Sequence, residues 1–198
     1  MRVIGITGRS GCGKSTVTRL YAAKGYPCLD ADAVARQVLQ PGSPCIKQLQ
    51  KVFGSDIVEE SGAVRRRLLA DRAFATRQGT AQLTAITHPE ILRRIEAWVE
   101  QARAAGAKLA FVDGAVIVGT PFEGRCDAIL LVAAPYEESV ARICRRDGIS
   151  PDMARRRLDA QTPEAALRAA ARYVLENDET PQRLEQKALT LLAQLGAG

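Results

Sequence analysis

The sequence predicts an α/β fold of three layers, α/β/α, with helices on both faces of a parallel sheet. Three observations favour this class. Residues 108–113 and 128–133 are continuous apolar runs, which is typical of buried parallel strands. An apolar N-terminal run leads through a glycine-rich turn into a helix, and strands alternate with helices along much of the chain. At 198 residues, the chain is long enough for one such domain with a small insertion.

The first forty residues are predicted to form two strand–helix pairs. Residues 1–7 are apolar and rich in β-branched side chains, and the helical pattern of residues 15–24 can end at the glycine that follows. A short second strand over residues 26–30 ends in an acid. Residues 31–40 then have helical spacing that stops at a Pro-Gly pair. This alternation is what a parallel sheet requires.

The rest of the chain is predicted to be mostly helical. Residues 43–104 form a helical block that we expect to be inserted into the sheet domain. The last helix of the block, 79–104, is expected to be interrupted at His88-Pro89, because proline favours the first turn of a new helix. The remaining predicted elements are helices 43–53 and 63–75, strands 108–113, 128–133 and 173–175, and helices 136–147, 151–160, 163–170 and 181–195.

Residues 8–15, Gly-Arg-Ser-Gly-Cys-Gly-Lys-Ser, match the pattern G-x-x-x-x-G-K-[ST] between the first strand and the first helix. Such a turn aims backbone N–H groups and the positive end of a helix dipole at one point, which suits a phosphate. Lys14 supplies a charge for the β- and γ-phosphates, and the Ser15 hydroxyl can ligate Mg²⁺. The sequence therefore predicts a P-loop NTPase fold that binds ATP and Mg²⁺, with nucleotide contacts at Gly11, Cys12, Gly13, Lys14, Ser15 and Thr16.

Composition and charge narrow the class of partner. Hydrophobic residues make up 46% of the chain and charged residues 25%, which is ordinary for a globular protein. Because no apolar run reaches the length of a membrane span, we expect a cytoplasmic protein with no membrane partner. The net charge of +6 comes mainly from arginine, and no aromatic residues interleave the arginine clusters. This distribution favours phosphate handling over nucleic-acid binding.

The five cysteines lack any C-x-x-C pair, so a disulfide framework or a zinc site is not expected. Cys12 differs from the others because it lies in the glycine-rich turn, close to Lys14 and to a helix N-terminus. Such surroundings lower the pKa of a thiol. We therefore expect Cys12 to be reactive, with alkylation inhibiting the protein and ATP protecting it.

Acids and arginines are predicted to gather at the same edge of the sheet as the turn. Asp30 and Asp32 follow the second strand, at the carboxyl edge where ligands bind in open α/β sheets. Asp113 ends the third strand and is predicted, with Ser15, to organise Mg²⁺. An arginine-dense helical segment follows the fourth strand, where small kinases carry a mobile lid.

Motifs outside the glycine-rich turn make the prediction more specific. They are Ile4-Gly-Ile-Thr-Gly8, Asp30-Ala-Asp32, Ala35-Arg36-Gln-Val, Pro41-Gly42, Phe53-Gly54, Gly62 with Arg67, Ile86-Thr-His88-Pro89, Arg146-Asp147, Gln161 and Asn177. In this order and approximate spacing, the chain from Ile4 to Asn177 resembles the dephospho-CoA kinase family. The resemblance implies transfer of the γ-phosphoryl group of ATP to the ribose 3′-hydroxyl of dephospho-CoA, the last step of coenzyme A synthesis.

The resemblance also implies roles for individual residues. Lys14, Asp32 and Arg146 are expected to be catalytic: Lys14 holds phosphate, Asp32 accepts or orients the proton of the acceptor hydroxyl, and Arg146 neutralises charge on the moving phosphoryl group. Nucleotide contacts are expected to extend to Arg142 and Asn177. Acceptor contacts are expected at Asp32, Arg36, Arg67 and His88.

The predicted layout is a single kinase domain with a core, a lobe and a lid. We expect the core at about 1–40, 105–135 and 171–198, a helical acceptor-binding lobe at about 43–104, and a short helical lid at about 136–165. The expected partner is a small molecule, dephospho-CoA, with no nucleic acid. The protein is expected to be a monomer or a weak homo-oligomer.

Two segments depart from the family's pattern. Before its final strand the family tends to have Ala-Asp, where this chain has Ala171-Arg172. The family usually follows its third strand with Asp-x-Pro-Leu-Leu-Phe-Glu, whereas this chain has Asp113-Gly-Ala-Val-Ile-Val-Gly119. The wall beside the acceptor is therefore expected to be remodelled. Two alternatives stay open: another small-molecule kinase, acting on a nucleoside, a nucleotide or a shikimate-like alcohol, and a phosphate-loop switch or nucleic-acid-stimulated ATPase.

Overall fold

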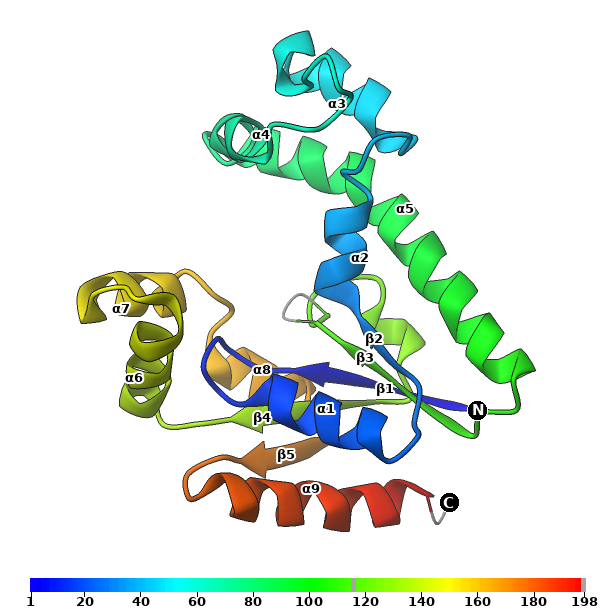
Figure 1. Cartoon of the computed structure of the whole chain (residues 1–198), viewed down its shortest axis with the longest axis vertical. Coiled ribbons are helices and arrows are strands. Elements are labelled where there is room, and N and C mark those ends of the chain that lie inside the picture. The colour runs from blue at the N-terminus through cyan, green and yellow to red at the C-terminus, as the bar shows by residue number, and fades with distance from the viewer. Residues whose placement is uncertain (115–116, 197–198) are drawn as a thin grey trace. The chain divides into compact units, whose positions relative to one another are not determined.

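The computed structural model describes residues 1–114 and 117–196. The chain divides into two compact units (Figure 1), and each is considered by itself. The first unit comprises Met1–Asp30 and Val99–Gly198, and contains the sheet. The second comprises Ala31–Trp98 and is helical.

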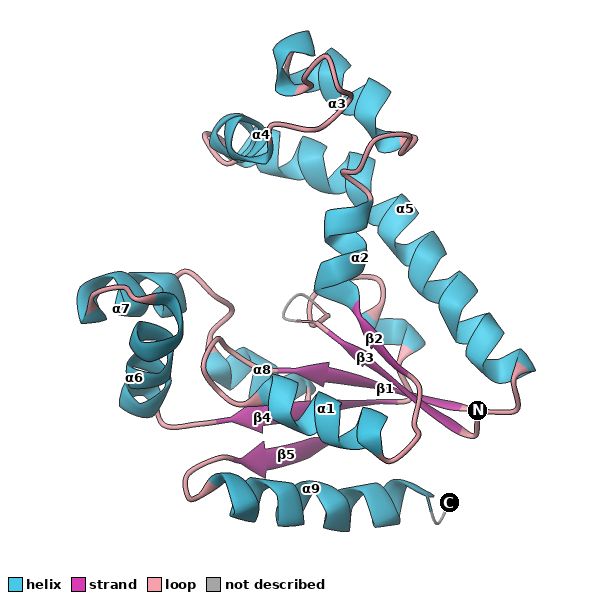
Figure 2. Cartoon of the chain, in the orientation of Figure 1, coloured by secondary structure: helices cyan, strands magenta, loops and turns pink. Residues whose placement is uncertain are grey.

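The described part of the first unit contains a five-stranded sheet in which every pairing is parallel (Figure 2). In spatial order the strands are β2 (Cys28–Asp30), β3 (Leu109–Asp113), β1 (Arg2–Thr7), β4 (Ala128–Ala133) and β5 (Tyr173–Glu176). Because β1 lies between β3 and β4, the direction of winding reverses at the end of β1. In open α/β sheets this reversal creates the ligand-binding crevice at the carboxyl ends of the strands.

Helices cover both faces of this sheet, as the sequence predicts. On one face, α1 (Lys14–Ala23) and α9 (Pro181–Gly196) pack against β1, β3 and β4 through a buried apolar cluster that includes Tyr21, Phe111 and Leu130. On the other face, Leu167 of α8 (Glu164–Ala170) packs against Leu131 and Ala133 of β4. The three-layer α/β/α architecture is therefore confirmed.

Two further helices follow β4 and form a small hairpin. They are α6 (Tyr136–Asp147) and α7 (Pro151–Asp159), and they pack together through Ile143, Ala154 and Leu158. Gly148 ends α6 in a left-handed conformation, and the Ser150 hydroxyl caps α7. We call residues 136–159 the α6–α7 hairpin. A short 3₁₀ helix, η2 (Glu123–Arg125), precedes β4.

The second unit is built from α2 (Ala31–Gln37), α3 (Cys45–Phe53), the 3₁₀ helix η1 (Ser55–Ile57), α4 (Arg66–Ala73) and most of α5 (Arg77–Ala104). Its buried core includes Leu49, Phe53 and Ile57. The predicted helix at 63–75 begins later than expected, at Arg66. The reason is that Val64 pairs with Val58 in an isolated antiparallel bridge, which holds residues 63–65 extended.

The predicted interruption at His88-Pro89 is wrong, because α5 runs through Pro89 without a break. A proline inside a helix removes one N–H donor but does not forbid the helix if packing compensates. Here Ile86 and Ile91, on either side of the proline, both pack against the core of the second unit. The Thr87 hydroxyl also donates to the Leu83 carbonyl at 2.8 Å and supports the preceding turn.

Candidate active site

The phosphate loop, residues 8–15, connects β1 to α1 and depends on its glycines. Gly11 (φ 79°) and Gly13 (φ 97°) occupy the left-handed region that other residues rarely adopt. Space is also lacking, since a Cβ at Gly11 would lie 2.6 Å from the Ser139 carbonyl oxygen, and one at Gly13 would collide with the Asn177 amide. The loop therefore needs glycine at both positions for its path and for its packing.

The N-terminus of α1 is prepared for an anion. Gly13 is its N-cap residue, and within the described structure no side chain caps the helix. The first N–H groups of a helix lack partners inside the helix, and they carry the positive end of its dipole. Thr16 N–H already turns back to the Gly13 carbonyl. The predicted nucleotide residues Gly11, Cys12, Gly13, Lys14, Ser15 and Thr16 thus lie together at this helix start.

Lys14 is paired with Asp113 at the end of β3. The Lys14 ammonium forms an ion pair with one carboxylate oxygen of Asp113, and the Thr18 hydroxyl donates to the other at 2.7 Å. Both side chains of the ion pair are largely buried, with 18% of Lys14 and 10% of Asp113 exposed. Thr18 lies one helical turn after Lys14, so the same helix supplies both contacts. Sequence reasoning missed Thr18, although its i+4 spacing from Lys14 was a usable signal.

The acidic residues at this edge suit Mg²⁺. Asp30 of β2 is in register with Asp113 of β3, so two carboxylates end neighbouring strands, and Ser15 is exposed at the start of α1. Oxygen ligands are those that Mg²⁺ prefers, and the ion usually takes one or two carboxylates together with phosphates and waters. Among the described residues, no cluster of three or more His, Cys, Asp or Glu forms a metal cage. The donor set therefore fits a magnesium ion carried by a nucleotide.

Asn177 contacts the protein backbone of the loop. Its side-chain amide is buried and donates to the Cys12 carbonyl at 2.8 Å, while its own N–H donates to Ala133 in β4. The sequence predicts a nucleotide contact for Asn177, and the structure places its amide against the phosphate loop. Its observed contact, however, holds the loop in place, and direct contact with the nucleotide stays a prediction.

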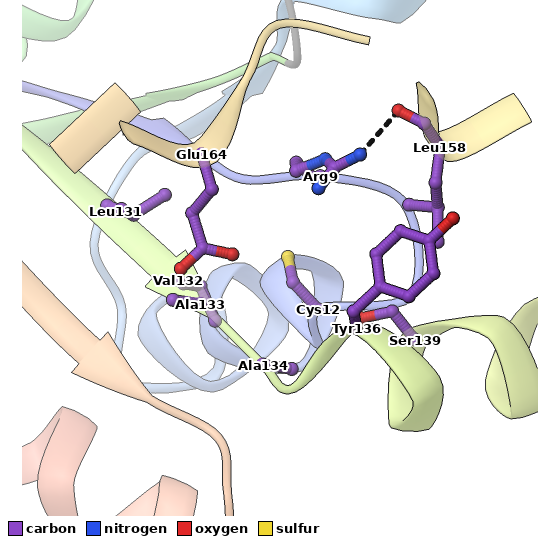
Figure 3. A pocket seen from close by; sticks show the side chains of 10 residues that line it. All are labelled: Arg9, Cys12, Leu131, Val132, Ala133, Ala134, Tyr136, Ser139, Leu158 and Glu164. Atoms are coloured by element: carbon purple, nitrogen blue, oxygen red, sulfur yellow. Dashed lines mark hydrogen bonds between the residues drawn. The ribbon is translucent and has the colours of Figure 1, made fainter. Parts of the chain in front are cut away.

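Cys12 corrects another expectation. Its side chain is 2% exposed, and burial raises the pKa of its thiol despite the opposing hydrogen bond and charge of Lys14. Cys12 lines a small cavity of about 10 Å³. Figure 3 shows it there together with Arg9, Tyr136 and Glu164. This space is too small for a nucleotide. The expected lowering of the Cys12 pKa is therefore wrong, because desolvation outweighs the nearby cation.

The arginines of the α6–α7 hairpin have different surroundings. Arg142 is largely buried and donates to the Gly11 carbonyl at 3.3 Å, so it contacts the phosphate loop directly. Arg146 is exposed and forms a two-point ion pair with Asp147, at 2.7 and 2.8 Å. Arg157 joins the same carboxylate. Hydrogen bonding to Arg146, followed by the charges of both arginines, lowers the pKa of Asp147.

The predicted acceptor residues all belong to the second unit. Asp32 lies in the first turn of α2, where a carboxylate is favoured by the helix dipole, and Arg36 is four residues later on the same helix. Arg67 is exposed on α4, and His88 is half-buried within α5. Within this unit, Arg66 donates to the Arg36 carbonyl at 3.4 Å and thus links α4 to α2.

Fold and site together define a class of protein. A parallel sheet with a phosphate loop after its central strand, a lysine paired with a strand-end aspartate, and an arginine-bearing hairpin after β4 define a phosphate-loop kinase. A family model described as dephospho-CoA kinase matches residues 2–182. The chain therefore belongs to the dephospho-CoA kinase family.

Individual relatives agree with this assignment. A dephospho-CoA kinase of Anaeromyxobacter dehalogenans is 38% identical over 198 residues, covering 100% of this chain and 94% of the relative. One of Corynebacterium diphtheriae is 38% identical over 191 residues, covering 96% of each. The crystal structure of TT1252 from Thermus thermophilus matches with a TM-score of 0.82 and 36% identity, covering 98% of this chain and 97% of that one. Dephospho-CoA kinase from Campylobacter jejuni, at 21% identity and a TM-score of 0.67 over 100% and 98% of the two chains, shares the fold.

Proposed function

We propose that this chain transfers the γ-phosphoryl group of ATP to the ribose 3′-hydroxyl of dephospho-CoA, giving coenzyme A and ADP. The observation that carries the proposal is the Lys14–Asp113 pair at a phosphate loop, in a chain that the family model matches over residues 2–182. Membership of this family makes the chain a kinase with ATP as donor and dephospho-CoA as acceptor.

The nucleotide side is proposed to be formed by the phosphate loop. Backbone N–H groups of residues 11–16 hold the β- and γ-phosphates, and Lys14 adds a positive charge when it turns from Asp113 to the nucleotide. Ser15 and Asp113 would hold Mg²⁺, with Asp30 beside Asp113 as a further oxygen donor. When bound, the ion neutralises charge on the phosphates.

The acceptor side is proposed to be formed by residues of the second unit. Asp32 accepts or orients the proton of the ribose 3′-hydroxyl as its oxygen bonds to the γ-phosphorus. The bond between that phosphorus and the β–γ bridging oxygen breaks, and ADP leaves with the bridging oxygen. Arg36, Arg67 and His88 bind the acceptor, which carries phosphates of its own.

The α6–α7 hairpin is proposed to act as the lid of the kinase, within about residues 136–165. The contact of Arg142 with the Gly11 carbonyl of the phosphate loop supports a position for this part of the hairpin beside the nucleotide phosphates. Arg146 is proposed to leave Asp147 and neutralise charge on the transferring phosphoryl group. The helical acceptor lobe, about 43–104, and the core at about 1–40, 105–135 and 171–198 complete the proposed layout.

We also propose that the enzyme works in the cytoplasm on free small molecules, as a monomer or a weak homo-oligomer, without nucleic acid. The scattered ion-paired arginines support this proposal: Arg72 pairs with Asp56, Arg155 with Glu137 and Arg168 with Glu176, so much of the basic charge has an acidic partner. Within the described residues, no helix is long and apolar enough to cross a membrane. Size-exclusion chromatography tests the oligomeric state, and a nucleic-acid binding assay tests the absence of nucleic-acid binding.

One acceptor panel tests the proposed reaction. ADP formation is followed with dephospho-CoA, adenosine, AMP, shikimate or RNA as acceptor, and the product is mapped by phosphorus NMR. We expect that, of these acceptors, dephospho-CoA is the one that supports ADP formation. Its product should carry a new phosphate on the ribose 3′-oxygen. Turnover with shikimate or a nucleoside, and none with dephospho-CoA, would favour the other small-molecule kinases. Stimulation of ATP hydrolysis by RNA would favour the ATPase.

A further inference from the structure

Gln161, which follows the α6–α7 hairpin, holds a residue of the phosphate loop at two points. Its side-chain oxygen accepts from the Ser10 N–H at 2.9 Å, and its side-chain nitrogen donates to the Ser10 hydroxyl at 2.8 Å. The orientation of the amide is settled by chemistry, because the backbone N–H can only donate and must face the oxygen. Both ends of the Gln161 amide are thus used on a single residue of the loop.

The neighbouring loop residue is tied to the same place. The Arg9 guanidinium donates to the Leu158 carbonyl at 2.6 Å and lies 5.7 Å from the centre of the Tyr136 ring (Figure 3). The Leu158 carbonyl also accepts from the Gln161 N–H. The Leu158 carbonyl, near the C-terminus of α7, therefore holds Arg9. The Gln161 side chain, two residues after α7, holds Ser10.

The hairpin reaches a third consecutive loop residue through Arg142, which donates to the Gly11 carbonyl. Because Ile143 of α6 and Leu158 of α7 share one buried cluster, the two helices are packed together. Residues 9, 10 and 11 of the loop are thus held by the hairpin and by Gln161, which lies two residues beyond it. Cys12, by contrast, is held by Asn177 at the end of β5.

We propose that Gln161 is a positioning residue that couples the α6–α7 hairpin to ATP binding. It fixes Ser10, so the loop amides keep their direction only while the end of α7 stays in place, and ATP on the loop in turn restrains α7. This inference rests on the proposed binding of ATP at the phosphate loop. It assigns Gln161 no contact with the nucleotide and no part in the chemical step.

A double-mutant cycle tests the contact itself. Gln161→Met keeps the length of the side chain and loses both hydrogen bonds, and Ser10→Ala loses one of them. By calorimetry we expect the Kd for ATP to rise about tenfold in Gln161→Met and about threefold in Ser10→Ala, from the usual cost of such bonds. The double variant should match Gln161→Met, because the Ser10 hydroxyl then has no partner left to lose.

Matched variants separate positioning from general damage. Ser10→Thr keeps the hydroxyl and should recover most of the ATP affinity that Ser10→Ala loses. Gln101→Met makes the same substitution at an exposed glutamine of α5 and should leave the Kd for ATP unchanged. The Kd for dephospho-CoA should not change in any of these variants. Should Gln161→Met fold poorly, the pair Ser10→Ala and Ser10→Thr still decides whether the contact matters.

Hydrogen exchange tests the coupling. In the wild type, ATP should slow amide exchange in residues 151–159, and this protection should fall at least threefold in Gln161→Met at saturating ATP. Additive effects in the cycle, ATP affinity within twofold of wild type in both single variants, or undiminished protection of α7 would overturn the inference alone. A wild type that binds no ATP would reject the proposed function, and this inference with it.

Discussion

The phosphate loop and the acceptor residues contrast in how the chain holds them. Each contact described for the loop comes from elements of its own unit, through Asp113, Tyr136, Ser139, Arg142, Leu158, Gln161 and Asn177. The residues proposed to bind the acceptor lie on three helices of the other unit, and Arg36 and Arg67 are exposed. The phosphate loop is thus held by several contacts within its own unit, whereas the residues proposed to bind the acceptor include two exposed arginines.

The largest effect should come from Lys14, the residue on which the nucleotide side most depends. Lys14→Ala removes the only loop cation proposed to touch the phosphates, and we expect kcat to fall about 10³-fold, the scale of losing one strong transition-state contact. ADP formation at saturating substrates measures it. Lys24→Ala, at the exposed end of the same helix, is the matched control and should keep wild-type turnover. A Lys14→Ala enzyme with more than a tenth of normal kcat would show that the loop is not the phosphate site.

Arg146 tests whether the hairpin belongs to the pre-built nucleotide side. An arginine inserted at the transferring phosphoryl group is worth about 10³-fold or more, so Arg146→Ala should lower kcat on that scale. Arg145→Ala, the exposed neighbour, is the control and should change kcat less than threefold. A loss under threefold in Arg146→Ala as well would leave Arg146 as a surface partner of Asp147.

Asp32 tests the acceptor side of the comparison. Asp32→Asn keeps the size of the side chain but cannot take a proton, so kcat should fall about 10²-fold, at the lower end of what a general base contributes. The Kd for ATP should stay within twofold of wild type, because Asp32 is proposed to act on the acceptor and not on the nucleotide. Asp71→Asn, an exposed carboxylate on α4, serves as control. Wild-type turnover in Asp32→Asn would remove Asp32 from the mechanism.

The smallest effect concerns the Cys12 thiol, which faces away from bulk solvent. Since burial raises its pKa, the thiolate is scarce near pH 8 and becomes common only at still higher pH. Iodoacetamide should label Cys12 more slowly than a free cysteine thiol, because the raised pKa leaves less thiolate and the buried sulfur is hard to reach. Peptide mass spectrometry with and without ATP measures this rate. If Cys12 is labelled as fast as the half-buried Cys144, and ATP slows this labelling, the expectation of a reactive Cys12 thiol would be supported after all.

Much of the fold could be predicted because its signals are local. The apolar runs at 108–113 and 128–133 became β3 and β4, and the pattern at residues 8–15 became the phosphate loop. The errors arose where tertiary packing decided the outcome. Pro89 predicts an interruption of the helix. However, α5 continues through it, because residues on both sides of the proline pack against the core of the second unit.

The candidate site was predictable in position and less so in its contacts. Lys14 and Asp113 lie together because parallel strands end at one edge, which follows from the strand pattern. The pKa of Cys12 could not be read from its neighbours in sequence, since the burial that raises it comes from β4 and α6. Gln161 lies 151 residues from Ser10, and a single sequence carries no sign of such a pair.

The second unit is one uninterrupted stretch of chain, Ala31–Trp98, between two parts of the first. Its replacement by the corresponding stretch of another small-molecule kinase would leave intact every contact described around residues 9–14. On the proposed layout, such an exchange would change which alcohol is phosphorylated and would keep the ATP-binding loop together with its contacts.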